Sequence, residues 1–304
     1  MVRTTLPYGA PPDRDYCPSA AAAPPAISLQ EVTKHFYKRG TRITALSNVS
    51  LHVARGAFVA IVGPSGCGKS TILDLIVGTE KPSAGTIHCG TERVEHLRVG
   101  TGYLTQHDTL LPWRSVEQNV RLPLDIAAHG LDRLRGRRTD AAAEERVAWA
   151  INLVGLKGFE HHLPEELSGG MRKRAALAQT LVYAGETVLM DEPFGALDFQ
   201  MRLLMQAELL QIWSTERRTI VFVTHDIEEA IVLSDQVVIM SRRPGRIRDI
   251  VPIDLPRPRD PVTARFIPRF RELYQRIWDQ LDPPENARPR APPNAAPPAA
   301  GAGQ

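Results

Sequence analysis

One glycine-rich segment constrains the fold of this chain more than any other. It fits the pattern GxxxxGK[ST], and its residues are Gly63, Pro64, Ser65, Gly66, Cys67, Gly68, Lys69 and Ser70. An apolar run, 58–62, precedes it, and apolar positions at helical spacing, 72–76, follow it. Glycines let successive backbone N–H groups turn inward around phosphate oxygens, and the start of a helix adds partial positive charge. This strand–loop–helix context predicts a phosphate-binding loop, in which Lys69 binds nucleotide β- and γ-phosphates and Ser70 binds Mg²⁺.

A second apolar run, 188–190, ends in two acids, Asp191 and Glu192. On its own, such a pair is as often a helix cap as a site. Beside a phosphate-binding loop, an Asp at a strand end holds Mg²⁺. Ligands of open α/β sheets bind at the carboxyl ends of the strands. We therefore predict that Asp191 binds the metal and that Glu192 acts as the general base on the attacking water.

The remaining pattern predicts an α/β fold. Short apolar runs bounded by turn or polar residues are typical of buried parallel strands, and they occur at 58–62, 188–190, 220–223 and 237–240. Alternation over 49–53 predicts a half-buried antiparallel strand. The stretch from about 107 to 180 carries helical stripes and no convincing strand, so we expect a helical insertion in the sheet.

Helix boundaries can be predicted at several places. Ser115 and Gln118 are spaced as a capping box at the start of a helix. A stripe over 147–154 predicts another helix, with an N-cap near Asp140 and an end at Gly155. Near the end of the chain, helical spacing is shown by Phe270, Leu273, Ile277 and Leu281.

Composition limits the classes of protein to which this chain can belong. No apolar run approaches the roughly 18 residues that span a bilayer, so a membrane role would require a partner. The beginning of the chain lacks a signal-peptide pattern, so export is not expected. The chain has three cysteines without CxxC spacing, which favours reduced thiols. Its net charge of +3 is too small to indicate nucleic-acid binding. Residues 1–26 contain six prolines and residues 283–304 contain seven, so we expect both tails to be disordered.

A further segment narrows the class of nucleotide-binding protein. Its residues are Leu167, Ser168, Gly169, Gly170, Met171, Arg172, Lys173 and Arg174. Alone, it could be merely an N-capped helix with a flexible entry. With its companions it resembles the LSGGQ signature of ABC transporter ATPases. Gln106, after an expected strand at 99–104, resembles the Q-loop glutamine; Gly195 to Asp198 resembles the D-loop; and His225 resembles the switch histidine.

This resemblance covers roughly residues 27–255 and implies roles for particular residues. Gln106 and His225 would join Glu192 in catalysis, and Gln106 would also bind Mg²⁺ with Ser70 and Asp191. Phe36 would stack on adenine, with Tyr37 as the alternative ring, and Thr71 would extend the phosphate site. A second subunit would contribute Ser168, Gly169, Gly170 and Asp198 in trans. Lys173, Gln179 and Thr180 depart from the usual family pattern, outside the phosphate-facing turn.

The resemblance also implies an architecture. We expect a P-loop NTPase core with an N-terminal antiparallel β subdomain and an α-helical insertion that carries the signature. The ATPase domain would span 27–260, with its insertion at about 107–180, and a C-terminal helix would span 261–282.

The implied partners are a second copy of the chain, integral membrane permease subunits and a solute-binding protein. The protein would lie peripherally at the cytoplasmic face of the membrane. Segments at 109–114 and 243–247 resemble the nitrate, sulfonate and taurine branch of importer ATPases. Leu110, Leu111 and Trp113 could form a permease-docking patch or be buried in the insertion. The alternatives are an ABC ATPase not involved in transport and a small-molecule kinase.

Overall fold

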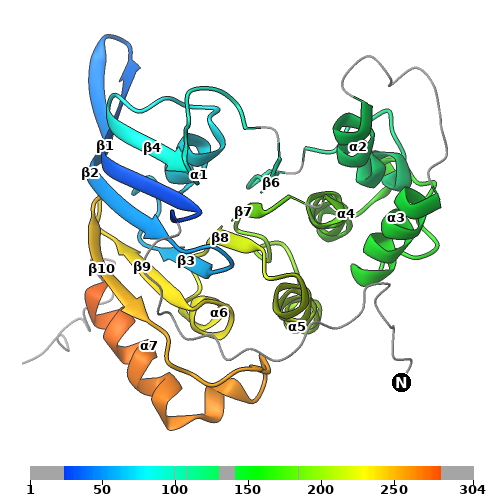
Figure 1. Ribbon diagram of the computed structural model, residues 1–304. Helices are drawn as coiled ribbons and strands as arrows, with labels where there is room; N and C mark the ends of the chain where they lie inside the picture. The colour runs from blue at the N-terminus through cyan, green and yellow to red at the C-terminus, as the bar shows by residue number, and fades with distance from the viewer. Residues whose placement is uncertain (1–23, 99, 108, 130–140, 184, 282–304) are drawn as a thin grey trace, which may run out of the picture.

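The computed structural model describes residues 24–98, 100–107, 109–129, 141–183 and 185–281. The predicted disordered tails lie almost wholly outside these ranges, and so does Asp140. Within them the chain forms two β-sheets and seven α-helices (Figure 1).

The larger sheet has six strands in the order β10-β9-β3-β8-β7-β6. They are β3 (Phe58–Val62), β6 (Thr101–Leu104), β7 (Thr187–Asp191), β8 (Thr219–Val223), β9 (Gln236–Met240) and β10 (Ile247–Pro252). Neighbouring strands are parallel, except that β10 is antiparallel to β9. The four predicted buried strands are therefore confirmed, and each apolar run lies within its strand.

The smaller sheet is antiparallel and has the order β2-β1-β4-β5. Its strands are β1 (Ile27–Lys38), β2 (Thr41–Val53), β4 (Ala84–Cys89) and β5 (Glu92–Arg93). In β2, Val49, Leu51 and Val53 are buried, whereas the residues between them are exposed. The predicted alternation is thus confirmed.

The helices are α1 (Lys69–Val77), α2 (Val116–His129), α3 (Ala141–Leu153), α4 (Gly169–Val182), α5 (Phe199–Glu216), α6 (Ile227–Leu233) and α7 (Pro268–Gln280). Single 3-10 turns occur at Pro164–Glu166 and Ala264–Phe266. The capping box before α2 is confirmed, because Gln118 N–H donates to Ser115 Oγ (3.3 Å) and Ser115 N–H donates to Gln118 Oε1 (3.2 Å). Gly155 follows α3 with φ +64°, as its predicted role at the helix end requires.

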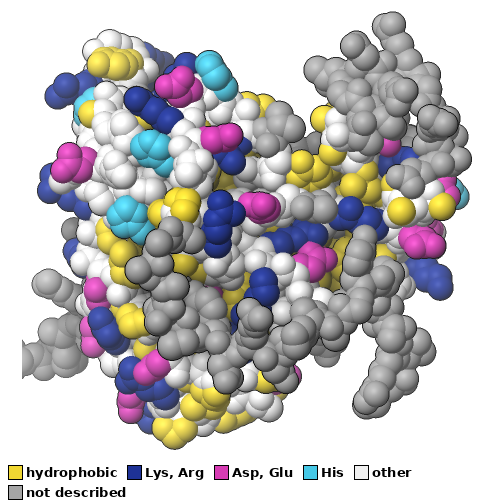
Figure 2. Space-filling view, in the orientation of Figure 1, with side chains coloured by type: hydrophobic (Ala, Val, Ile, Leu, Met, Phe, Trp, Pro, Cys, Tyr) yellow, Lys and Arg dark blue, Asp and Glu magenta, His cyan; other side chains and the backbone are white. Residues whose placement is uncertain are grey.

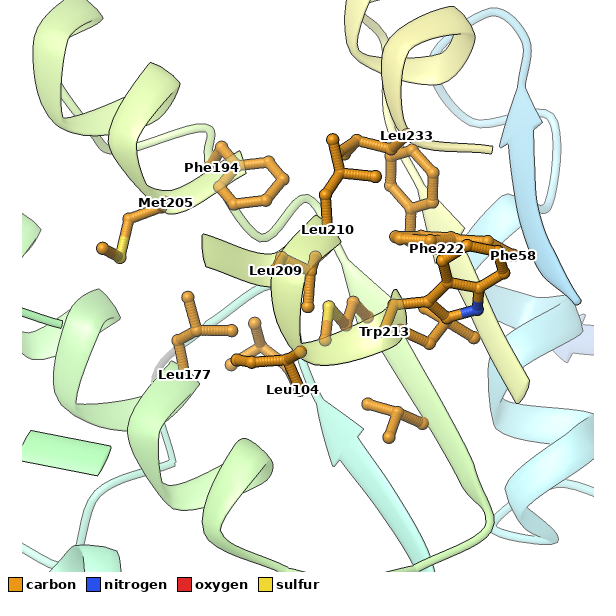
Figure 3. Close-up of a cluster of buried hydrophobic side chains, with 14 of the residues drawn as sticks. Phe58, Leu104, Leu177, Phe194, Met205, Leu209, Leu210, Trp213, Phe222 and Leu233 are labelled. Carbon is orange, nitrogen blue, oxygen red and sulfur yellow. The ribbon is translucent and has the colours of Figure 1, made fainter. Parts of the chain in front are cut away.

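The parallel sheet divides the interior into two cores. Phe58, Ala60 and Val62 of β3 point into the larger core, which α2 to α7 cover. Val59 and Ile61 point into the smaller core, which α1 and the antiparallel sheet cover. Figure 3 shows the aromatic centre of the larger core, where the Phe58 ring lies 5.9 Å from Trp213 and 5.5 Å from Phe222, centroid to centroid. Consequently α1 and α4 lie on opposite faces of the sheet.

The distribution of charged side chains on the surface agrees with the small net charge of +3. Figure 2 shows acidic and basic side chains intermingled on the face in view. Among the described helices, none is long and apolar enough to cross a membrane. Cys67 and Cys89 are buried free thiols, and Cys17 lies outside the described residues.

Candidate functional site

The glycine-rich loop connects β3 to α1 and depends on backbone conformations that glycine adopts readily. Gly66 has φ +74° and Gly68 has φ +104°. A Cβ on Gly68 would lie 2.7 Å from Leu46 Cδ2, so neither the conformation nor the space admits a side chain. The loop thus makes a tight turn at the start of α1.

Lys69 closes this loop. It is the first residue of α1, and only 8% of it is exposed. Its Nζ donates to the carbonyls of Gly63 (2.8 Å) and Pro64 (3.1 Å), so the ammonium spans the loop from its last turn to its first residues. A buried ammonium that donates to neutral carbonyls is well suited to bind an anion.

Two of the predicted metal ligands are in contact. Asp191 ends β7 and is 3% exposed. Burial raises the pKa of its carboxyl, and a hydrogen bond from Ser70 opposes that rise. Hydroxyl and carboxylate oxygens are the ligands that Mg²⁺ prefers. Among the described residues, no cluster of three or more His, Cys, Asp or Glu could hold a metal ion.

Glu192 and His225 also lie side by side, after β7 and β8 respectively. Glu192 Oε1 is 3.3 Å from His225 Nδ1. The backbone of Glu192 has φ +48°, an uncommon conformation for a residue other than glycine, and its N–H donates to the Val223 carbonyl (2.9 Å). This turn directs the carboxylate along the sheet edge toward the loop that carries His225.

A buried carboxylate supports the His225 loop. Thr224 Oγ1 donates to Glu229 Oε2 (2.7 Å) and accepts from the Asp226 N–H (3.0 Å). Burial raises the pKa of Glu229, and the hydrogen bond from Thr224 opposes that rise. Sequence reasoning missed Glu229, because an acid in the first turn of a helix is common for electrostatic reasons alone.

Gln106 lies two residues beyond β6, the strand next to β7. Leu104 pairs with Met190, so the chain after β6 passes beside the strand end that carries Asp191. The Gln106 side chain is exposed. The register of two parallel strands thus sets the position of Gln106 near the end of β7.

The signature turn lies elsewhere. Ser168 caps α4, its Oγ accepting the Met171 N–H (3.3 Å), and Asp198 caps α5, its Oδ1 accepting the Met201 N–H (2.9 Å). A Cβ on Gly170 would lie 3.3 Å from the Ala196 carbonyl, so the signature turn approaches the D-loop segment. The helix that this turn begins, α4, covers the opposite face of the sheet from α1.

The predicted adenine platform is on β1. Phe36 is half-buried, and Lys34 Nζ lies 4.9 Å from the centroid of its ring. Lys34 is itself held by Glu80 at 2.6 Å. Tyr37 is 74% exposed. Since Phe36 is fixed by these neighbours and Tyr37 is not, Phe36 is the better platform of the two.

The segment after β9 supports the phosphate loop. The sequence pattern predicted the loop but not this contact. Gly245 N–H donates to the Ala45 carbonyl (2.8 Å), and a Cβ on Gly245 would lie 2.0 Å from the Cys67 carbonyl. Arg243 Nε donates to the Gly66 carbonyl (3.2 Å). The segment that resembles a branch of importer ATPases therefore packs directly on the loop.

The apolar residues after Gln106 do not behave alike. Leu110 is buried in the larger core, Leu111 is half-buried, and Trp113 is 72% exposed. Leu110 therefore cannot belong to a docking patch, because its side chain packs inside the insertion. Trp113 alone is largely available to a partner.

The profile of the ABC transporter family matches residues 46–195. An ABC transporter ATP-binding protein of Methanocaldococcus jannaschii is 41% identical over 255 residues, covering 84% of this chain and 92% of that protein. The aliphatic sulfonates import ATP-binding protein of Bacillus cereus is 37% identical over 256 residues, covering 84% of this chain and 96% of that protein.

A solved structure agrees. It is a dimeric ATP-binding cassette in a post-hydrolysis state, bound to ADP and phosphate. It superposes with a TM-score of 0.67 at 29% identity and covers 75% of this chain and 98% of that chain. The predicted P-loop NTPase fold is thus confirmed. The chain belongs to the ABC transporter family, as an ATP-binding protein that hydrolyses ATP.

Proposed function

We propose that this protein is the Mg²⁺-dependent ATPase subunit of an importer and that residues 27–260 form its ATPase domain. One observation carries the proposal. Lysine, hydroxyl, carboxylate and imidazole groups converge where β3, β7 and β8 end, and they belong to Lys69, Ser70, Asp191, Glu192 and His225.

Each group has a distinct task in phosphoryl transfer to water. Lys69 and the loop N–H groups bind the phosphates, and Phe36 stacks on adenine. Ser70, Asp191 and Gln106 would hold Mg²⁺, which neutralises developing charge on the phosphates. Glu192 accepts a proton from the attacking water, and His225 donates a hydrogen bond to the γ-phosphate.

The active unit is a head-to-tail homodimer. Ser168, Gly169, Gly170 and Asp198 of one subunit complete the phosphate site of the other. The placement of α1 and α4 on opposite faces of the sheet supports this arrangement, and the similar cassette solved with ADP and phosphate is a dimer. The helix N-terminus at Ser168 supplies N–H groups for an anion.

The membrane partners and the solute follow from the relatives. A relative of 37% identity is an aliphatic sulfonates import protein, so we propose uptake of a small solute such as nitrate, a sulfonate or taurine. Permease subunits and a solute-binding protein would complete the importer. The subunit would sit at the cytoplasmic face, with Trp113 at the permease contact.

Glu192→Gln tests the proposal, because it keeps the shape of the side chain and removes its basicity. The purified variant should bind ATP with unchanged affinity, while Mg²⁺-dependent turnover falls by roughly 10²-fold or more. Cells that carry only this variant should lose uptake of a labelled aliphatic sulfonate. Near-normal turnover would contradict the general-base role. Normal sulfonate uptake with abolished turnover would contradict the importer assignment.

A further inference from the structure

The helix that carries the signature also carries a buried lysine. Lys173 lies in the second turn of α4 and is only 5% exposed. Its Nζ donates to the carbonyls of Thr105 (2.8 Å) and Gln106 (2.9 Å) and lies 3.5 Å from the Asp191 carbonyl. One ammonium therefore contacts two different segments of the candidate site.

These segments follow neighbouring strands of the parallel sheet. Thr105 and Gln106 come directly after β6, and Asp191 ends β7. An ammonium has three donors, and burying it is costly unless they are hydrogen-bonded. These three contacts of Lys173 form only while α4 is seated against both strand ends, so the position of the helix and the position of these backbones are linked.

The contact with Asp191 is to its backbone carbonyl, at the end of β7. Lys173 therefore acts on the placement of the strand end that carries one proposed metal ligand, and on the backbone of the other, Gln106.

We propose that Lys173 is a positioning residue of the metal site: it fixes Gln106 and Asp191 relative to the signature helix, so that Mg²⁺ binds fully only when α4 is docked on the core. This inference rests on the proposed function, in which Gln106 and Asp191 hold Mg²⁺. Ser168 caps the same helix, so a displacement of the signature turn would be transmitted through Lys173 to the metal ligands.

Lys173→Met provides the test, because methionine is of similar length and cannot donate. The measurement is ATPase rate against Mg²⁺ concentration at saturating ATP, followed by rate against ATP at saturating Mg²⁺. Loss of a group that orients metal ligands costs about 10–100-fold in metal affinity. We expect the Mg²⁺ concentration for half-maximal rate to rise by about 10-fold, with little change in the KM for ATP. Lys157→Met, at an exposed lysine of the same insertion, is the matched control and should leave both curves unchanged.

Two further variants distinguish positioning from general support of the fold. If Lys173 acts through Gln106, its effect should largely disappear in the Gln106→Ala background, whereas independent effects would multiply. Lys173→Gln retains donors and should restore part of the Mg²⁺ response. If Lys173→Met does not fold, Lys173→Gln is compared with the unchanged protein, and an unaltered Mg²⁺ curve then overturns the inference.

The results of these measurements distinguish a failure of the inference about Lys173 from a failure of the proposed function. A Mg²⁺ response that Gln106→Ala shifts but Lys173→Met does not would overturn the role of Lys173 alone. An ATPase whose rate is insensitive to Gln106→Ala would overturn the proposed metal ligands, and with them this inference. A shift for Lys173→Met that multiplies with that of Gln106→Ala would show that the lysine acts independently and would also contradict the proposal.

Discussion

At the scale of single residues, two glutamates near His225 have opposite surroundings. Glu192 is partly exposed and lies 3.3 Å from the imidazole, where it can meet water. Glu229 is buried and accepts the Thr224 hydroxyl at 2.7 Å, so it holds the loop without facing it. The proposed base, Glu192, is thus open to solvent, whereas the same type of side chain at position 229 is buried and anchors the loop.

The raised pKa of Glu229 should affect how the stability of the fold depends on pH. Burial raises the pKa of Glu229 in the folded protein. The protonated Glu229 carboxyl then contributes its full share to the free energy of unfolding below the ordinary glutamate pKa of about 4.3. This share is lost as the pH rises through the pKa of Glu229 in the folded protein. Glu229→Gln is neutral throughout and can still accept from Thr224. Without nucleotide, the melting temperature of this variant minus that of the unchanged protein should increase from about pH 4 to pH 7. A difference that stays flat or decreases would contradict a raised pKa.

At the scale of elements, residues 243–245 follow β9, pack against the phosphate loop and support it. Gly245 sits between Ala45 of β2 and Cys67 of the loop, and no side chain fits there. Arg243 adds a hydrogen bond to the outer carbonyl of Gly66. The loop is thus held from behind as well as closed by Lys69, which keeps its N–H groups in place before a phosphate arrives.

Gly245→Ala tests this support. The added Cβ would lie 2.0 Å from the Cys67 carbonyl, so the loop must shift. Overpacking of this kind costs about 1–3 kcal/mol, and we expect the Kd for ATP to rise about 10-fold or more. Isothermal titration calorimetry measures this directly. Arg246→Ala, at the next and exposed residue, should bind ATP normally. A Gly245→Ala protein with a lower melting temperature but unchanged ATP affinity would show that the segment supports the fold and not the loop.

The elements also show how far sequence reasoning reaches. The four apolar runs were recognisable because each is short, continuous and bounded by turn or polar residues. β1 was not, because its pairing with β2 shifts register three times and breaks the two-residue period. β10 is an edge strand in which only Val251 is fully buried, so it has no apolar run.

The same distinction applies to the candidate site. The phosphate loop and the acid pair after β7 are contiguous in sequence, so their chemistry was predictable from local pattern. Lys173 and Arg243 were treated as departures or branch markers, because their partners are distant: Lys173 is 67 residues from Gln106, and Arg243 is 177 residues from Gly66. Only the fold brings them together.

At the scale of the whole molecule, the helices that start at the phosphate loop and at the signature turn lie on opposite faces of the larger sheet. α1, which begins at Lys69, packs in the smaller core, and α4, which Ser168 caps, packs in the larger one (Figure 1). In the proposed dimer, each of these helix starts is half of a phosphate site. A pair of chains related head to tail would join each phosphate loop to the partner's signature turn.

Mixing two inactive variants tests this arrangement. Lys69→Ala removes a charge-assisted contact worth roughly 1.5–3 kcal/mol, and Ser168→Arg places a bulky side chain in the signature turn. Each homodimer then has two damaged sites. In a mixed dimer built in trans, one site collects both lesions and the other collects none, so one intact site should occlude ATP. Occluded nucleotide in the purified mixed dimer is the measurement, since coupling between sites could suppress turnover. If each site were built within one chain, every site would keep one lesion, and the mixed dimer would occlude no more ATP than either variant alone.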